Sequence, residues 1–450
     1  MKILRKNTIQ IGTIWDVAVV GGGPAGMMAA GRAAELGAKV ILLEKNPNLG
    51  KKLLISGGGR CNVLNATFDN RKLLERYGVG GKFLFSTFSQ HNATDSLNFF
   101  NSRGMATKVE AEDRVFPASD SSRSVLEVLV NYLKQGNVTV MMGAEVAEIT
   151  ADVAKIHAVA SNKSNADAQN FIQSIKLKNG DKICAKSFII ATGGKACPET
   201  GSTGEGFIWL KKLGHNIIKP DSSLVPIIIK EPWIKELQGV SMPEVKISIL
   251  QENSDAKLKK VETKKGKILF THFGVSGPTI LNMSKKVSEL LSYGDVTLSL
   301  DIAPRHDFAT LNEMLQKLFK KEAAKMIKNV LVAMAPATVV PAAFVPIILK
   351  MANIDPDKTA HDITREERIR LMKTLKDIPM RVGGLLGIEN SIVSSGGVDL
   401  VEVDFKTMRS RLFKNLYVVG DMLNIDRPSG GYSLQLCWTT GFVAGTHSIE

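Results

Sequence analysis

The 450-residue sequence has few of the residues that build disulfide scaffolds or metal centres. Its four cysteines, at positions 61, 184, 197 and 437, form no CxxC pair, and its seven histidines are scattered along the chain. Disulfide scaffolds and two-cysteine redox centres need paired cysteines, and metal centres need clustered ligands. The sequence therefore predicts free thiols in a reducing, cytoplasmic compartment, and no bound metal.

Long hydrophobic runs suited to a membrane are also scarce. Residues 330–349 carry no charge and are numerous enough to span a bilayer. Prolines at 336, 341 and 346 interrupt this stretch, however, and proline breaks a helix. We expect short buried helices there, a short tail over residues 1–13 in place of a signal segment, and no stable membrane association.

Acidic residues are outnumbered by basic ones, 44 against 58, which gives a net charge of +14. Such a balance favours a polyanionic partner such as RNA, although a solvated basic surface without a ligand has the same composition. The charge is densest beside a predicted hairpin turn at Asn253–Asp255, where six lysines crowd together: Lys257, Lys259, Lys260, Lys264, Lys265 and Lys267. Along a strand, several of them share one face, as a track for phosphates or as protection of an exposed edge strand.

A strand–turn–helix–strand pattern begins near the N-terminus. The apolar run Val17–Val20 leads into Gly21-x-Gly23-x-x-Gly26 and a helix of small residues, and a second apolar run ends at Glu44. In a dinucleotide-binding fold the first glycine makes the tight turn, the second lets the backbone approach a pyrophosphate, and the third lets the helix lie close on the strand. The helix N-terminus then attracts the phosphates. Because Glu44 is placed to accept hydrogen bonds from the adenosine ribose, the pattern predicts an adenine dinucleotide.

Two further pieces favour FAD over NAD. Residues 188–194 form a buried strand that ends in a Thr-Gly-Gly turn, and residues 416–421 form a strand that ends in Gly420-Asp421. A glycine pair at 430–431 then opens a helix. In FAD proteins of this fold, a carboxylate here hydrogen-bonds the ribityl chain, and the helix N-terminus stabilises the negative charge of reduced flavin. Each piece alone is also an ordinary strand–helix turn, but the three in this order predict FAD.

A glycine-rich loop lies between the first glycine turn and the strand at 188–194, with the sequence GKKLLISGGGRCN over residues 50–62. It can wrap a phosphate and lie against a ring, although its composition also suits a flexible surface loop. With this loop, the chain resembles the YhiN/BaiN-type flavoproteins, also called aminoacetone-oxidase-family FAD-binding enzymes. The matching stretches lie between residues 16 and 445 and read GGGPAGMMAA, GKKLLISGGGRCNVLN, FIIATGGKACPETGSTGEGF, FTHFGVSGPTIL, SSGGVDL and LYVVGDMLNIDRPSGGYSLQ.

The resemblance implies an FAD-dependent oxidoreductase that reduces a conjugated C=C bond by hydride transfer from flavin N5. One branch of the family is linked to steroid-like enones, and another to uridine in ribosomal RNA, which becomes dihydrouridine. The basic charge favours ribosomal RNA here. Two alternatives stay open: an NAD(P)H-dependent flavin reductase or oxidase of a small-molecule enone or amine, and a flavin-bearing RNA-binding factor without turnover.

The chain departs from the family near the ribityl carboxylate. The family usually has Glu where Asp421 stands, Asp-Val-Asp-Gly at residues 424–427, and Asn at Ser433. Because Asp is one methylene shorter, we expect a water or Asp426 to complete the contact. The predicted cofactor residues are Gly21, Gly22, Gly23, Pro24, Ala25, Gly26, Glu44, Lys45, Lys52, Gly58, Gly59, Arg60, Cys61, Asn62, Val146, Ala191, Thr192, Gly193, Gly420, Asp421, Gly431, Tyr432, Ser433 and Leu434.

The predicted fold class is α/β, with a Rossmann-like FAD-binding domain interrupted by an insertion. We expect the FAD-binding domain over residues 1–199 and 381–450, an inserted β-rich substrate domain over 200–305, and a small helical lobe over 306–380. The insertion reads as strands of a small barrel or sheet over 225–248, 261–270 and 296–302, and the lobe as helices over 308–328 and 365–376.

The sequence names no certain proton donor or second nucleotide site. Gly201, Gly204 and Gly206 have the wrong spacing for another GxGxxG turn, so NAD(P)H, the expected electron donor, would reach the flavin through a shared site. Cys61 is a candidate acid because it lies in the glycine loop, although a small apolar wall residue is the favoured interpretation. His272 is a candidate if the inserted domain closes over the flavin, and is otherwise an ordinary core histidine.

Overall fold

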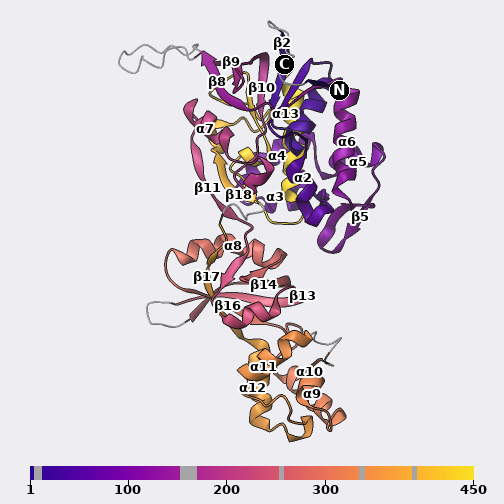
Figure 1. Ribbon diagram of the computed structural model, residues 1–450, viewed down its shortest axis with the longest axis vertical. Coiled ribbons are helices and arrows are strands. Elements are labelled where there is room, and N and C mark those ends of the chain that lie inside the picture. Colours follow the sequence, from indigo (N-terminus) through magenta and orange to yellow (C-terminus); the bar gives the residue numbers. More distant parts are fainter. Residues whose placement is uncertain (5–12, 153–169, 253–257, 333, 335–339, 388–392) are drawn as a thin grey trace. The chain divides into compact units, whose positions relative to one another are not determined.

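The computed structural model describes residues 1–4, 13–152, 170–252, 258–332, 334, 340–387 and 393–450 (Figure 1). The chain divides into two compact units. One is formed by Met1–Ser222 together with Ile392–Glu450, and the other by Ser223–Ser391. Both ends of the sequence therefore contribute to the same unit, as a discontinuous nucleotide-binding domain requires.

The first unit is built on an eight-stranded sheet. Its strands follow the order β1 (Lys2–Leu4), β7 (Thr139–Met142), β3 (Val40–Glu44), β2 (Ile14–Val20), β10 (Lys182–Ile190), β9 (Phe171–Leu177) and β8 (Val146–Asp152), with β19 (Leu416–Val418) paired to β10. All pairs from β1 to β10, and the pair of β10 with β19, are parallel, whereas β10, β9 and β8 are antiparallel neighbours. Every residue of β3 is buried, as parallel strands covered on both faces require.

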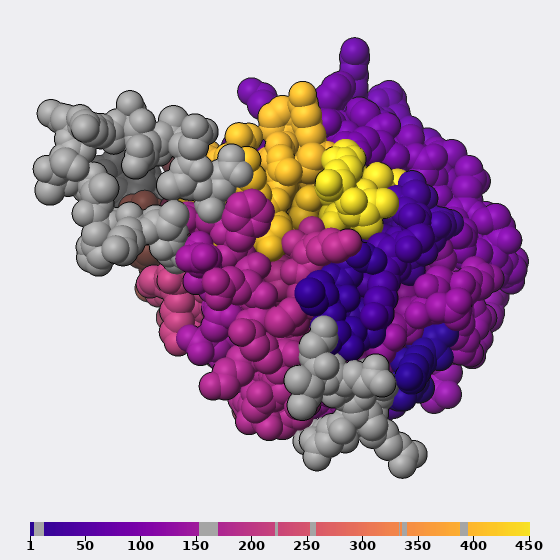
Figure 2. Space-filling model, turned by 90° about the horizontal axis from the view of Figure 1, so that it is seen from above, coloured from indigo at the N-terminus to yellow at the C-terminus, as the bar shows by residue number. Residues whose placement is uncertain are grey.

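Helices of small residues cover this sheet. Helix α1 (Pro24–Glu35) follows β2 directly, and α13 (Tyr432–His447) packs along it. The two backbones approach closely because Gly441 faces α1: a Cβ there would lie 2.5 Å from the Ala25 carbonyl oxygen. On the face of the molecule seen in Figure 2, C-terminal residues in yellow accordingly lie beside N-terminal residues in indigo.

Further helices and strands complete the first unit. Its remaining helices are α2 (Lys51–Ile55), the 3-10 turn η1 (Ser56–Gly59), α3 (Asn70–Glu75), α4 (Gly80–Gln90), α5 (Ala93–Ser102), α6 (Ser122–Gln135) and α7 (Glu205–Lys212). The strands β4 (Leu64–Asn65), β6 (Arg114–Pro117) and β5 (Thr107–Glu110) form a small sheet, and β11 (Ile217–Ser223) pairs with β18 (Val393–Val398).

The second unit contains a closed β-barrel, which confirms the β-rich insertion in the predicted fold class. Its strands follow the order β12 (Ile227–Ile229), β15 (Gly274–Ser276), β14 (Leu258–Thr271), β13 (Ser241–Glu252), β16 (Val296–Asp301) and β17 (Ile378–Leu385). All its neighbours are antiparallel. The turn predicted at Asn253–Asp255 lies outside the described residues, as does Lys257.

Helices continue the core of the second unit: α8 (Pro278–Leu291), α9 (Phe308–Lys321), α10 (Ile327–Val332), α11 (Val345–Met351) and α12 (Arg365–Lys376). The single helix expected over 308–328 is wrong, because the chain leaves α9 after Lys321 and Met326 forms a β-bridge with Thr359. Short helices flank the proline-rich stretch, as expected, although residues 333 and 335–339 lie outside the description. No helix within the described ranges is long and apolar enough to cross a membrane.

Candidate functional site: a cleft at the strand ends

A solvent-open cleft lies in the first unit, where β2, β3, β10 and β19 end. Ligands of open α/β sheets bind outside the carboxyl ends of the strands. The cleft gathers predicted cofactor residues from distant parts of the sequence, namely Gly21, Gly22, Gly23, Pro24, Ala25, Glu44, Lys45, Lys52, Val146, Ala191, Thr192, Gly193 and Asp421.

In the glycine turn between β2 and α1, two glycines are required by close packing and a third faces open space. Gly21 has φ +107°, and a Cβ there would lie 2.5 Å from the Ala191 carbonyl oxygen. A Cβ at Gly26 would lie 1.9 Å from the Gly21 oxygen, so this glycine sits behind the cleft and serves packing. Gly23 differs from both: its φ is −81°, and a Cβ there would meet no atom within 4 Å. Space is therefore left at the α1 N-terminus, where N–H groups and the helix dipole favour an anion.

Glu44 closes the turn from the end of β3. Its Oε2 accepts a hydrogen bond from the Gly22 nitrogen at 2.7 Å, and its Oε1 accepts from the backbone and side-chain nitrogens of Asn46 at 2.7 and 2.8 Å. The carboxylate is 7% exposed and lines the cleft. It is thus rigidly placed, and Oε2, which accepts one hydrogen bond, keeps a second lone pair for another donor.

Residues 200–205 and Trp209 add a wall that the motifs did not predict. Lys45 anchors this wall through bonds of 2.7 Å to Thr203 Oγ1 and 2.7 Å to Glu205 Oε2, and Asn46 Nδ2 donates to the Thr200 oxygen at 3.0 Å. The glycines of the stretch CPETGSTGEGF are the sequence feature that could have indicated this wall, since Gly201 and Gly204 have φ values of +103° and +78°. Their spacing excluded a second nucleotide turn, but they build part of the first site.

Asp421 stands between two cations at the other end of the cleft. Its Oδ1 accepts a hydrogen bond from Arg427, and its Oδ2 lies 3.6 Å from Lys52 Nζ. Burial raises the pKa of Asp421, but attraction by Arg427 and Lys52 outweighs this effect and lowers the pKa overall. Lys52 Nζ is buried and has no hydrogen-bond acceptor among the described residues. The contact of Asp426 or a water with the cofactor stays a prediction.

Arg427 links Asp421 to the start of α13. Its side chain is only 1% exposed and also donates to Ser433 Oγ at 3.1 Å and to the Ile425 oxygen at 2.5 Å. Gly431, the residue before α13, has φ +99°, and a Cβ there would lie 2.4 Å from the Leu64 carbonyl carbon. The predicted residues Gly420, Gly431, Tyr432, Ser433 and Leu434 do not line the cleft itself; they form the strand end and first helical turn beside it.

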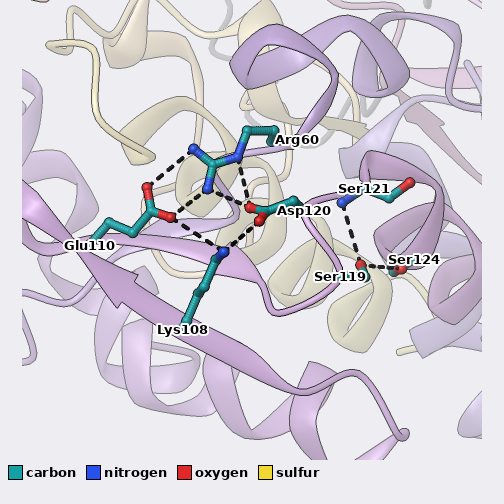
Figure 3. A network of polar contacts seen from close by, with 7 residues as sticks. All are labelled: Arg60, Lys108, Glu110, Ser119, Asp120, Ser121 and Ser124. Carbon is teal, nitrogen blue, oxygen red and sulfur yellow. Dashed lines mark hydrogen bonds and ion pairs between the residues drawn. The ribbon is translucent and has the colours of Figure 1, made fainter.

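Arg60 fixes the glycine-rich loop to neighbouring elements (Figure 3). Its guanidinium donates to Glu110 at 3.2 Å and to Asp120 at 2.8 Å, and lies 4.2 Å from the centroid of the Phe116 ring. Lys108 contacts the same two carboxylates. Arg60 therefore positions the loop from outside the cleft, while Gly58 and Gly59 keep open space at their Cβ positions.

The next two loop residues also lie outside the cleft. Cys61 is fully buried, and burial raises the pKa of its thiol to about 12, partly offset by a hydrogen bond with Ser56. The Asn62 carboxamide joins the loop to α13: in the orientation that satisfies both of its ends, its oxygen accepts from the Gly431 nitrogen at 3.0 Å and its nitrogen donates to the Leu64 oxygen at 3.0 Å. The loop and the α13 N-terminus are thus neighbours.

His272 belongs to the second unit. It follows β14, its side chain is exposed, and its ring packs edge-on against Phe273 with centroids 4.8 Å apart. Within the described residues, no group of three or more His, Cys, Asp or Glu is placed to hold a metal ion.

Residues 15–447 of the chain match the family model described as the HI0933-like protein Rossmann domain. The chain belongs to this family. Over 97% of its length it is 27% identical to a ribosomal RNA dihydrouridine synthase of Escherichia coli, 98% of which is covered. Over 96% of its length it is 26% identical to a 3-dehydro-bile acid delta(4,6)-reductase of Clostridium scindens, 99% of which is covered.

Solved structures support the fold of this family member. The chain aligns over its full length with all of a 3-ketosteroid-delta4-(5alpha)-dehydrogenase from Rhodococcus jostii, at a TM-score of 0.52 and 14% identity. A 3-ketosteroid delta1-dehydrogenase from Sterolibacterium denitrificans gives the same TM-score of 0.52 over 97% of the chain and 99% of that structure. The family resemblance predicted from the motifs is confirmed, and the chain is an FAD-dependent oxidoreductase of the HI0933-like family.

Proposed function

We propose that the cleft holds the adenosine, pyrophosphate and ribityl parts of FAD. The observation that carries this proposal is the space at Gly23, which sits at the N-terminus of α1 and which any side chain would fill. Lys52 adds a buried ammonium group in need of an acceptor, and Glu44 Oε2 offers a lone pair to a ribose hydroxyl. These groups fit a dinucleotide with two phosphates, so the site suits the cofactor of the family.

The residues of the glycine-rich loop and the α13 N-terminus are proposed to hold the flavin ring. Gly58 and Gly59 leave their Cβ positions open, and Asn62 ties the loop to Gly431. The helix dipole of α13 and the cation Arg427 favour negative charge near this place. FAD, when bound and reduced, supplies a hydride for the β carbon of a conjugated C=C bond.

The substrate we propose is uridine in ribosomal RNA, reduced to dihydrouridine. The uracil 5,6 double bond is conjugated to a carbonyl, so one hydride at the β carbon and one proton at the α carbon complete its reduction. A net charge of +14 and a near full-length relative with this activity support the choice. Such a substrate implies a cytoplasmic protein, with NAD(P)H as the proposed donor of the two electrons.

A small-molecule enone reductase is the second candidate. The Clostridium scindens relative, a bile-acid reductase, is almost as similar as the ribosomal RNA enzyme, at 26% against 27% identity. The proton donor does not separate the two, since both reactions need one. Of the two acids proposed from the sequence, Cys61 is fully buried, which raises the pKa of its thiol to about 12 and disfavours it as the proton donor, while His272 stays a prediction from the sequence.

Mass spectrometry of ribosomal RNA tests this function. Deleting the gene should remove dihydrouridine from one or more ribosomal RNA positions, and re-expression should restore it. Re-expression of a Gly23→Val variant, which cannot place the pyrophosphate, should not restore it. If ribosomal RNA is unchanged while the purified protein oxidises NAD(P)H with an added enone, the small-molecule reductase replaces this proposal. If neither acceptor is reduced, a flavin-bearing RNA-binding factor is left.

A further inference from the structure

The strand register sorts the lysines of β14 onto the two sides of the barrel wall. One side packs on α8: a Cβ at Gly266 would lie 2.5 Å from Thr279 Oγ1, and Lys264 Nζ donates to the Asn282 oxygen at 2.8 Å. Lys264 also pairs with Glu262 at 3.1 Å. This lysine is therefore committed to contacts within the unit and is unsuited to a phosphate track.

The opposite side of β14 carries the exposed lysines. Lys265 and Lys267 alternate with the α8-facing residues and are both exposed. A β-bulge shifts the register, since Ile249 is opposite Glu262 whereas Leu250 is opposite Lys260. Residues directly opposite each other in a sheet point to the same side, so Lys260 is on the side of Leu250. Leu250 is on the same side of the wall as Lys265, so the bulge at Val261 places Lys260 and Lys265 on one side.

Strand β13 adds a fourth cation, Lys246, directly opposite Lys265. Lys246 pairs with Lys265 in the antiparallel register, and like charges in directly opposed positions destabilise a sheet. We call Lys246, Lys260, Lys265 and Lys267 the lysine face. The nearby acids already have cations of their own: Glu244 bonds Arg305 at 2.8 Å, and Asp301 pairs with Lys376 at 2.6 Å. The lysine face therefore keeps an excess of positive charge.

We propose that the lysine face binds the phosphate backbone of the RNA substrate. Lys265 and Lys267 lie two residues apart on one strand, about 7 Å along it, which suits successive phosphates of an extended strand. Small hydroxyl groups next to the lysines, Ser248 and Thr263, bonded to each other at 2.8 Å, leave the surface flat enough for a backbone to approach. The inference rests on the ribosomal RNA substrate proposed above and adds where that substrate is held.

The test compares two charge-matched triple variants of the full-length holoprotein. One replaces three residues of the lysine face, Lys260→Gln, Lys265→Gln and Lys267→Gln. The control replaces three exposed lysines of α9, Lys317→Gln, Lys320→Gln and Lys321→Gln. Affinity for a labelled 24-nucleotide single-stranded RNA of mixed sequence is measured from 50 to 300 mM KCl. FAD content and the thermal midpoint check that both variants are folded.

The face variant should bind RNA about a hundredfold more weakly at 0.1 M salt, with a log Kd–log salt slope lower by about two units, because each lost phosphate contact removes about 0.7 of slope for single strands. The control should keep the wild-type slope. Equal losses in both variants, or an unchanged face variant, would overturn the proposal. Binding of wild type to phosphatidylserine vesicles with no binding to RNA would overturn it too, in favour of an anionic lipid surface.

The ribosomal RNA readout separates this proposal from the proposed function. If the wild-type gene restores dihydrouridine in a deletion strain and the face variant restores it equally at low expression, only the lysine face is refuted. If wild type restores none but binds RNA through the lysine face, the reaction proposed is refuted while the surface stands.

Discussion

Substitutions at Gly23 test cofactor binding without disturbing the fold. Its backbone is extended, with φ −81° and ψ −175°, so an alanine or valine there is unstrained. Its Cβ would meet no protein atom within 4 Å. Gly23→Ala and Gly23→Val should therefore fold, at a cost below about 1 kcal/mol for the changed N-cap, and place their side chains where the pyrophosphate is proposed to lie.

The size of the effect follows from the bonds that the side chain displaces. If the pyrophosphate moves away from α1 and loses two charge-assisted hydrogen bonds, each worth about 1.5–3 kcal/mol, binding weakens by about 3–6 kcal/mol. This corresponds to an increase in Kd of about a hundredfold to ten-thousandfold. Valine should act more strongly than alanine, because it fills more of the same space.

Three measurements on each variant test this prediction. The absorbance ratio at 450 and 280 nm gives FAD occupancy, and titration of the apoprotein with FAD gives Kd, while the thermal midpoint of the apoprotein reports folding. Gly26→Ala is the contrasting variant: its Cβ would lie 1.9 Å from the Gly21 oxygen, so it should lose thermal stability outright. A Gly23→Val protein that purifies fully yellow, with wild-type Kd, would refute the placement of the pyrophosphate at this turn.

Three further predictions concern charge and kinetics. Arg427→Met removes the buried guanidinium and its hydrogen bonds but leaves Lys52 beside Asp421, so it should destabilise the apoprotein by about 1–3 kcal/mol, seen in urea denaturation; an unchanged midpoint would mean that Asp421 is not held by Arg427. Burial lowers the pKa of His91 and of His215 to about 4. Because the unfolded chain protonates first, stability should fall as the pH drops from about 6.5 to 4, by up to about 3 kcal/mol for each histidine, and the double variant His91→Gln/His215→Gln should flatten this slope; an equally steep slope would contradict it. Finally, with a shared site for donor and acceptor, double-reciprocal plots for NAD(P)H should be parallel, and intersecting lines would show a ternary complex instead.

Local patterns predicted the elements that carry their own signals. The apolar run before the first glycine turn became β2, the small residues after it became α1, and the helix expected over 365–376 has those bounds in α12. Thr364 and Glu367 form a capping box at its start, a signal written in four consecutive residues. Such features depend on neighbours in the sequence, so the sequence alone suffices to place them.

Contacts between distant segments escaped prediction. The wall at residues 200–205 belongs to the cleft only because Lys45 and Asn46, more than 150 positions earlier, bond to it. Likewise, the pairing of Met326 with Thr359 interrupts a stretch whose own periodicity continues the helix. Neither the wall nor the end of the helix can be predicted from the residues nearby in the sequence, because each depends on tertiary packing that overrides local preference.

The charges around Asp421 connect the departures from the family pattern to the cofactor. Two cations, the buried Arg427 and the largely buried Lys52, lie beside one carboxylate, so one positive charge is in excess and its partial desolvation costs free energy. An anionic ligand offsets this cost, and FAD brings negative charge both in its pyrophosphate and, when reduced, on its ring. Arginine in place of the family's usual glycine and aspartate in place of its glutamate therefore act together: the shorter carboxylate holds Arg427, while Lys52 keeps an ammonium group that still needs an acceptor. The site is thus built for a ligand that carries negative charge.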